Sequence, residues 1–264
     1  MSPMHGLAIP ALVCTAFLIA RDGVVLAGNN EDWIDRDTKV WFHPAADGRL
    51  GRVYFGFSNG FAQGGMNEKG LFFDGFALDD DEAAPASRKP YDKGLGQLVD
   101  DVMSRCATVA EVLQWFDRYE LGYGRAQLIF GDAGGDAALV ERNAVVRKKG
   151  DFLVGTNFRQ SQVDPKKSGC VRWAKADSLL REAAGADVDL VRRVLDATHQ
   201  EITVYSNVYD LRRGEVQLYL NHDFSRGVSF RLREELQRGE RALDLPAFVE
   251  ELRARGGQPA SRPR

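Results

Sequence analysis

The chain has 264 residues, of which 44% are hydrophobic and 28% charged, and its formal net charge is −3 at pH 7. This length and composition suit one large globular domain, or at most two, and no basic run or stripe marks a nucleic-acid partner. The three cysteines form no spaced set, so the sequence predicts neither a disulfide framework nor a zinc site and fits a reducing compartment.

Residues 1–13 contain one mildly apolar run, from Leu7 to Val13. The run is too short to span a membrane, and it lacks the charged n-region and the length of a secretory signal. We interpret residues 1–13 as a short propeptide of a cytoplasmic protein; a secretory leader truncated by a misassigned start codon is the alternative. No other segment of the sequence has the length of a transmembrane helix.

The stretch from Cys14 to Trp33 predicts a strand, a tight turn at residues 21–23 and a second strand that ends in a polar elbow. A hairpin folds the end of its second strand back beside the start of its first. Cys14 should therefore lie close to the elbow, which runs from Asn29 to Asp32. A thiol near a carboxylate and two amides is a candidate active site.

Cys14 has two interpretations. A single Cys at the start of an apolar strand is more often a small buried hydrophobe than a nucleophile. Catalysis would require a base nearby, because a thiol is a weak nucleophile at its free pKa. The α-amino group of an N-terminal Cys can serve as that base, since it titrates at about 7.7–8.0. Cleavage before Cys14 would therefore be an activation step.

The next part of the chain predicts strands and then helices. Strands are expected at residues 38–44 and 53–57, and a further pair is expected around the turn at residues 67–70. The acidic stretch at residues 79–82 lacks the spacing of a calcium loop and is interpreted as a solvated charge run.

Two amphipathic helices should follow. One has an apolar face from Leu95 to Met103. The other should begin at Thr108, which looks like an N-cap with Glu111 at the capping-box position.

The second half of the chain also predicts both strands and helices. Predicted strands lie at residues 126–130, 137–141, 145–147, 152–154, 202–211 and 216–220. One helix should begin near residues 169–173, and two further helices should cover residues 188–195 and 243–253. Residues 257–264 should form a loose tail. Two sets of strands with helices between and after them suit a layered α/β (α+β) protein with mostly antiparallel sheets.

Four blocks carry a family resemblance. They are Cys-Thr with Gly-Asn-Asn-Glu-Asp-Trp at residues 28–33, Gly-Met-Asn-Glu-Lys-Gly-Leu at 65–71, Thr-Asn at 156–157, and the Arg that opens a helix at residue 172. Together they resemble the N-terminal nucleophile (Ntn) hydrolases of the linear-amide type. These include choloylglycine hydrolases, penicillin V acylases, acyl-CoA:isopenicillin N acyltransferases and carcinine-hydrolase-like proteins.

The resemblance covers roughly residues 14–220 and implies a four-layer αββα sandwich. It also implies that residues 1–13 are a propeptide removed autocatalytically, and that residues 14–264 form a single domain with a C-terminal helix. Hydrolysis of a linear amide bond in a small N-acyl compound, through an S-acyl enzyme, is then the expected activity. This reaction requires neither a metal nor an organic cofactor, and the resemblance is compatible with a homo-oligomer.

Residue by residue, the resemblance makes Cys14 the nucleophile, with Asp32 anchoring its amino group or thiol by a charge-assisted hydrogen bond. Asn157, with a backbone N–H near Ala77, would hold the oxyanion, and Arg172 would position the thiol. Local patterns alone favour a turn residue for Asn157 and a surface residue for Arg172.

The acyl group would occupy an apolar pocket. Its candidate lining residues are aromatic, and some of them should belong to the core: Trp33, Phe61, Phe57, Phe76 and Trp41.

Two departures from the family pattern bear on the substrate. Choloylglycine hydrolases have an Arg in place of Asn29 and an Asn in place of Ala77, which argues against bile-salt hydrolysis. The first block is closer to the acyltransferase and carcinine-hydrolase branch, so acyl transfer through the same thioester is an alternative. There are two further alternatives: a non-catalytic relative that binds an acylated ligand, and a structural subunit of a homo-oligomer.

Overall fold

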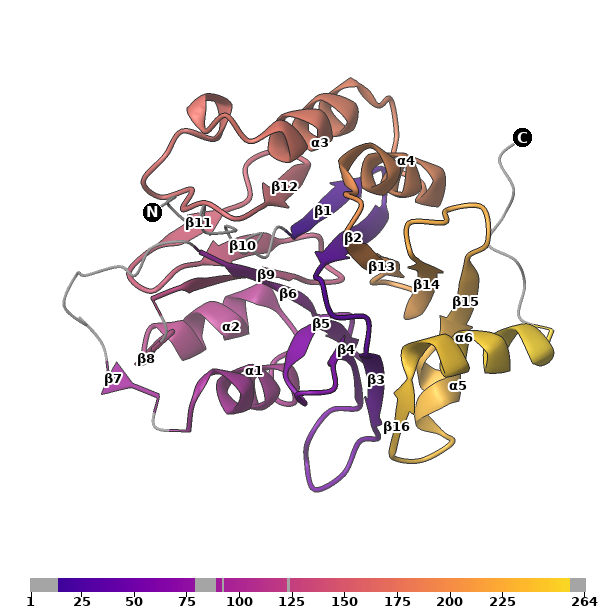
Figure 1. The fold of residues 1–264 in the computed structure, drawn as a ribbon. Helices are drawn as coiled ribbons and strands as arrows, with labels where there is room; N and C mark the ends of the chain where they lie inside the picture. Colours follow the sequence, from indigo (N-terminus) through magenta and orange to yellow (C-terminus); the bar gives the residue numbers. More distant parts are fainter. Residues whose placement is uncertain (1–13, 79–88, 92, 123, 257–264) are drawn as a thin grey trace, which may run out of the picture.

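The computed structural model describes residues 14–78, 89–91, 93–122 and 124–256. The predictions for the leader, for the acidic stretch at 79–82 and for the tail fall outside these ranges. Two antiparallel sheets face each other, and helices cover the outer face of each (Figure 1). The predicted four-layer sandwich of two mostly antiparallel sheets is confirmed.

One sheet carries the start of the described chain. Its six strands lie in the order β12 (Phe152–Gly155), β1 (Thr15–Arg21), β2 (Val24–Asp32), β13 (Thr203–Asp210), β14 (Glu215–Leu220) and β15 (Val228–Arg231).

The other sheet has eight strands. Their order is β11 (Val145–Arg147), β10 (Ala137–Val140), β9 (Ala126–Gly131), β6 (Phe72–Ala77), β5 (Ala62–Asn67), β4 (Arg52–Phe57), β3 (Thr38–His43) and β16 (Arg241–Asp244). A short parallel pair, β7 (Lys89–Pro90) with β8 (Tyr119–Glu120), stands apart from both sheets.

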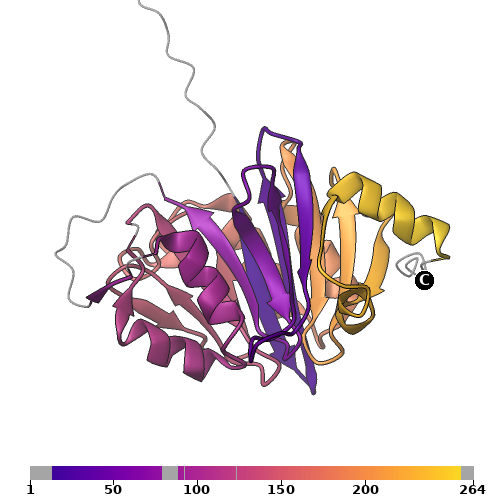
Figure 2. The same ribbon diagram turned by 90° about the horizontal axis from the view of Figure 1, so that it is seen from below.

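The helices divide between the two outer faces. Helices α3 (Val171–Glu182) and α4 (Val188–Thr198) pack on the six-stranded sheet, and α1 (Leu95–Met103) with α2 (Val109–Phe116) packs on the eight-stranded sheet. Helices α5 (Leu232–Leu236) and α6 (Leu245–Ala254) pack beside β3 and β15, at one flank of the sandwich (Figure 2). A 3-10 turn covers Pro165–Lys167.

Local sequence signals account for several of these boundaries. The hydroxyl of Thr108 accepts a hydrogen bond from the backbone N–H of Glu111, and the Glu111 carboxylate accepts one from the backbone N–H of Thr108. This confirms the predicted capping box, whose N-cap hydroxyl is worth about 1 kcal/mol. Gly28 permits close packing of β2 on α4, because a Cβ there would lie 2.8 Å from Val191 Cγ1.

Two sequence predictions were wrong in detail. The polar elbow at residues 29–32 belongs to strand β2, because its backbone pairs with β1 on one side and β13 on the other. The last helix begins at Leu245, and the two residues before it belong to β16.

Each helix in the described ranges is too short or too polar to cross a membrane.

Candidate active site

The side chains of β1 and β2 alternate between two environments. On β1, Ala16 and Leu18 lie in the core between the sheets, whereas Phe17 packs with α3 and α4. On β2, Ala27 faces the same interior and Leu26 faces the helices. Since strand side chains alternate with a period of two, Cys14 and Glu31 face the interior between the sheets.

Cys14 and Glu31 are neighbours across the hairpin, one step beyond the paired residues Thr15 and Asn30. The thiol Sγ of Cys14 donates a hydrogen bond to Glu31 Oε1 at 3.6 Å. The exposed fraction is 2% for Cys14 and 0% for Glu31. A buried carboxyl group therefore touches the predicted nucleophile.

Both groups prefer their protonated form. Burial, followed by the negative charges of Glu31, Asp32 and Asp74, raises the pKa of the Cys14 thiol well above its usual value. Burial, followed by the charge of Asp32, raises the pKa of Glu31 to about 8, and the hydrogen bond from the thiol opposes this rise. The thiol in this chain is therefore a weak nucleophile without a base.

A second buried carboxyl group faces Glu31 from the other sheet. Asp74 on β6 is 0% exposed, and burial followed by the charge of Glu31 raises its pKa well above the usual value. Its strand partner is Gly64, where a Cβ would lie 2.6 Å from Asp74 Oδ2. The glycine therefore makes room for the carboxyl group.

Asp32 faces the opposite side of β2, toward the helices. Its carboxylate accepts hydrogen bonds from the hydroxyl of Thr203 and from Gln200 Nε2, the latter at 3.1 Å. A register shift in β13 between Thr203 and Tyr205 brings that hydroxyl opposite Asp32. Burial raises the pKa of Asp32 to about 6, and the bond from Thr203 and the charge of Arg172 limit the rise. Asp32 is therefore largely ionised at neutral pH.

Arg172 joins the predicted residues into one network. Its Nη1 donates to the backbone carbonyl of Cys14 and, at 2.9 Å, to Thr15 Oγ1. Its Nη2 donates to Asn157 Oδ1 at 3.2 Å. Asn157 Nδ2 in turn donates to the carbonyl oxygen of Ala77 at 2.9 Å. The guanidinium thus contacts the backbone and neighbours of Cys14.

A pocket of about 310 Å³ opens beside the thiol. Its lining is mostly apolar and comes from five segments of the chain: Cys14, Phe61, Gln63, Gly75, Phe76, Ala77, Leu78, Leu95, Arg125, Ala126 and Leu128. Of the aromatic residues predicted to line the acyl pocket, Phe61 and Phe76 line this pocket, and Ala77 lines it as well.

The other predicted pocket residues lie elsewhere. Trp33 is not among the described residues that line the pocket, and its ring packs on Phe57 with centroids 6.2 Å apart. Phe57 belongs to the core between the sheets. Trp41 packs with the cluster under α1 and α2.

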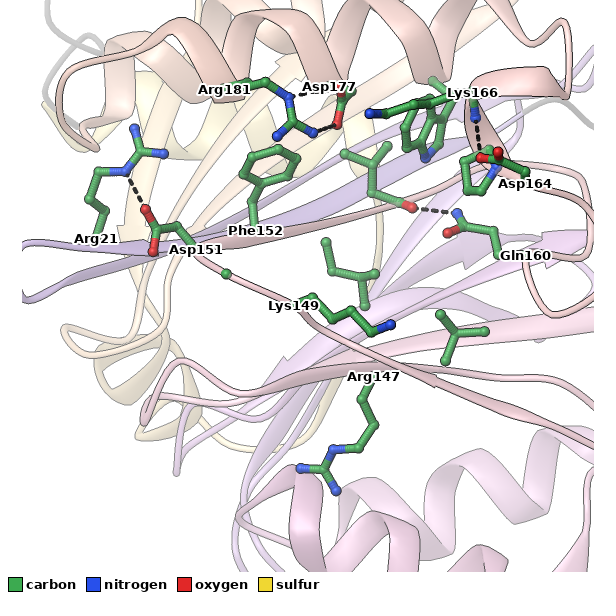
Figure 3. Close-up of a pocket in the computed structure, with 16 residues that line it drawn as sticks. Arg21, Arg147, Lys149, Asp151, Phe152, Gln160, Asp164, Lys166, Asp177 and Arg181 are labelled. Carbon is green, nitrogen blue, oxygen red and sulfur yellow. Dashed lines mark hydrogen bonds and ion pairs between the residues drawn. The ribbon is translucent and has the colours of Figure 1, made fainter.

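A larger cavity, of about 630 Å³, lies between the β11–β12 region and α3, and none of the predicted site residues lines it. Its charged rim is partly neutralised by internal ion pairs, Arg21 with Asp151 at 2.9 Å and Arg181 with Asp177 at 2.6 Å (Figure 3). We therefore place the candidate active site at the smaller pocket.

The structure brings Cys14, Asn157, Arg172 and Ala77 together, and Asp32 lies on the opposite face of β2 from Glu31. Sequence reasoning missed Glu31 and Asp74. The parity of β2 could have identified Glu31, because it has the same parity as Ala27. No local signal points to Asp74, since its place depends on how the two sheets stack.

Comparison with solved structures identifies the fold. Penicillin V acylase from Agrobacterium tumefaciens matches with a TM-score of 0.63 and 17% identity, over 88% of this chain and 92% of that chain. A variant of conjugated bile acid hydrolase from Clostridium perfringens matches with a TM-score of 0.66 and 13% identity, over 87% and 96%. A Caenorhabditis elegans ortholog of N-acylethanolamine-hydrolyzing acid amidase matches with a TM-score of 0.59 and 16% identity, over 75% and 93%.

No protein-family model and no curated protein sequence matches the chain. The three structures are similar in fold, which is the fold of the linear-amide Ntn hydrolases that the sequence resembles.

Proposed function

We propose that the chain is a cysteine Ntn amidohydrolase, which cleaves the linear amide bond of a small N-acyl compound after autocatalytic removal of residues 1–13. The observation that carries this proposal is the position of Cys14. It lies directly before β1, beside an apolar pocket, and Arg172 binds its carbonyl oxygen. The neighbouring structures, each named for cleavage of an acyl compound, support the reaction class.

Cleavage before Cys14 supplies the missing base. The new α-amino group titrates near neutral pH and can take the thiol proton, directly or through one water. Asp32, ionised above about pH 6, would hold that amino group as an ammonium ion once it has accepted the proton.

The thiolate then attacks the acyl carbon, and charge develops on the carbonyl oxygen. The Asn157 amide, oriented by Arg172 and Ala77, would donate to that oxygen. One such donor contributes about 2.7–4 kcal/mol in comparable sites. The α-amino group returns its proton to the leaving amine, and water cleaves the S-acyl enzyme.

Acyl transfer uses the same thioester with an amine in place of water, so it remains the second candidate. The apolar lining near Phe61 and Leu128 favours an apolar acyl group in both cases.

The proposal is tested by trapping the acyl enzyme. The protein is incubated with p-nitroanilides of a graded series of acyl groups and quenched in acid, and the mass of the peptide that begins at Cys14 is measured. We expect an added acyl mass on this peptide and release of p-nitroaniline. A protein that forms no adduct and releases no p-nitroaniline with any acyl group would favour the non-catalytic, acyl-binding alternative. Added amines that divert the product from acid to amide would identify a transferase.

A further inference from the structure

Self-cleavage before Cys14 cannot use the α-amino group that serves as the base in the mature enzyme, because that group does not yet exist. In the intact chain, Cys14 is an internal residue, so its nitrogen is an amide with no useful basicity. The thiol must nevertheless lose its proton before it can attack the preceding carbonyl. We propose that Glu31 is the general base of this self-cleavage, taking the thiol proton of Cys14 before the α-amino group exists. This inference rests on the proposed function, because it concerns the maturation of the same nucleophile.

The geometry places Glu31 at the reacting atom. Its Oε1 accepts the hydrogen bond from Cys14 Sγ at 3.6 Å, and a candidate base must lie within hydrogen-bond reach of the proton it takes. Strand β2 pairs with β1 on one side and β13 on the other. This pairing fixes the Glu31 backbone opposite the nucleophile. Asp32 cannot take this role equally well, because its carboxylate is turned to Thr203 and Gln200.

The surroundings make Glu31 a strong base for a carboxylate. The titratable groups that bear on it are Cys14, Asp32, Asp74, Tyr205 and Tyr209. All of them are neutral or negative, and burial is the main cause that raises the pKa of Glu31 to about 8. General bases work best when their pKa lies near the working pH.

Asp74 does not compete for this role. Burial, followed by the charge of Glu31, raises the pKa of Asp74 well above its usual value, so an ionised Glu31 opposes the ionisation of Asp74. In addition, its oxygens lie beside Gly64 on the opposite sheet. Asp74 therefore offers a matched control for Glu31: a second fully buried carboxyl group in the same interior.

The step balances with water as the only reagent. The Glu31 carboxylate takes the thiol proton, and Sγ forms a bond to the carbonyl carbon of residue 13. The bond from that carbon to the Cys14 nitrogen breaks, and the protonated Glu31 gives its proton to the nitrogen, which becomes the α-amino group. Water then hydrolyses the thioester, releasing residues 1–13 as a carboxylate and restoring the thiol.

The test follows self-cleavage of the full chain, freshly synthesised by cell-free translation, by intact mass over time after transfer to buffers between pH 6 and pH 9. Cleavage of the wild-type chain should accelerate as Glu31 ionises and level off above about pH 8. Glu31→Gln should slow cleavage by about 10²–10⁴-fold, the usual contribution of a general base, whereas Asp74→Asn should stay within about tenfold of wild type. Thermal unfolding of each variant shows whether it is folded.

Chemical rescue separates a base from a structural role. Glu31→Ala leaves space beside the thiol, so added formate should restore part of the cleavage rate in that variant and none in Cys14→Ala. Cleavage of Glu31→Gln at the wild-type rate, or a wild-type rate that is independent of pH, would overturn the inference and leave the proposed function standing. A wild-type chain that keeps residues 1–13 at every pH would instead contradict both.

Discussion

The side-chain amide of Asn157 is held at both ends: Arg172 Nη2 donates to its Oδ1 at 3.2 Å, and its Nδ2 donates to the carbonyl oxygen of Ala77 at 2.9 Å. A guanidinium has no acceptor and a carbonyl oxygen has no donor, so the amide can adopt only this orientation. Its N–H group therefore points toward the strand end that lines the pocket. A preoriented donor of this kind is what an oxyanion requires.

Asn157→Ala should lower kcat by about 10²–10³-fold with little change in KM, because the donor acts mainly on charge that develops in the transition state. Steady-state kinetics with the best p-nitroanilide measure both constants. Asn157→Asp, which keeps the shape of the side chain and lacks the donor, should show the same loss. An increase confined to KM would show that Asn157 only binds the substrate.

The two buried cysteines should respond differently to removal of their thiols. Cys14→Ala should abolish turnover and leave residues 1–13 attached, because no other thiol lies at the pocket among the described residues. Cys106 lies in the core beneath α1 and α2. Cys106→Ala should therefore cost roughly 1 kcal/mol of stability and leave turnover intact.

Amide hydrolysis assays and thermal unfolding of both variants check this pair. Residual amidase activity in a Cys14→Ala protein would refute the assignment of the nucleophile. Equal loss of activity in both variants would point to a folding defect.

The stability of the intact chain should fall as the pH rises. Glu31 has a usual pKa of 4.5 and a folded-state value of about 8, so between these values the folded chain holds a proton that the unfolded chain has lost. Its contribution is complete below about pH 4.5 and is lost as the pH passes through about 8. One such group changes the free energy of unfolding by up to about 1.4 kcal/mol per pH unit.

Urea unfolding of Cys14→Ala between pH 6 and pH 8 measures this slope without interference from self-cleavage. Adding Glu31→Gln to that background should remove most of the slope that Glu31 provides. Identical slopes in the two proteins would mean that the Glu31 carboxyl group has its ordinary pKa in the fold.

Phe61 should set the acyl preference. It lines the pocket together with Cys14 and Ala77, so Phe61→Ala should lower kcat/KM for bulky apolar acyl groups by about tenfold. This corresponds to the loss of roughly 1.5 kcal/mol of apolar contact. Acetyl amides should lose less, because they do not reach the side chain.

Trp33 provides the comparison, since it packs on Phe57 and is not among the described residues that line this pocket. If Trp33→Phe changed acyl preference more than Phe61→Ala does, the acyl group would lie on the Trp33 side of the nucleophile.

Much of the fold could be predicted because its signals are local. Apolar runs bounded by Gly, Asp and Asn identified most strands, and the pair Thr108 and Glu111 identified a helix start that the structure confirms. The strand β15 and the short helix α5 escaped prediction, because a four-residue strand and a five-residue helix give too little periodicity.

The site was predictable only as far as the hairpin reaches. The prediction that Cys14 lies beside residues 29–32 is confirmed. Because those residues were predicted to form an elbow and not a strand, the alternation of side chains that puts Glu31 and Asp32 on opposite faces was missed. The contact from Arg172 to the carbonyl of Cys14 joins residues 158 positions apart, and Asp74 arrives from the other sheet. Such contacts depend on how the two sheets and the helices stack on one another, and no short stretch of the sequence specifies that stacking.

Whether Cys14 becomes an N-terminal nucleophile is tested by the intact mass of the freshly purified protein, followed by sequencing of its N-terminus. We expect a mass that lacks residues 1–13, with a free α-amino group on Cys14. A stable mass that retains residues 1–13, in a folded protein that does not change on prolonged incubation at pH 8, would contradict this expectation. Cys14 would then be an ordinary buried cysteine of a β-strand.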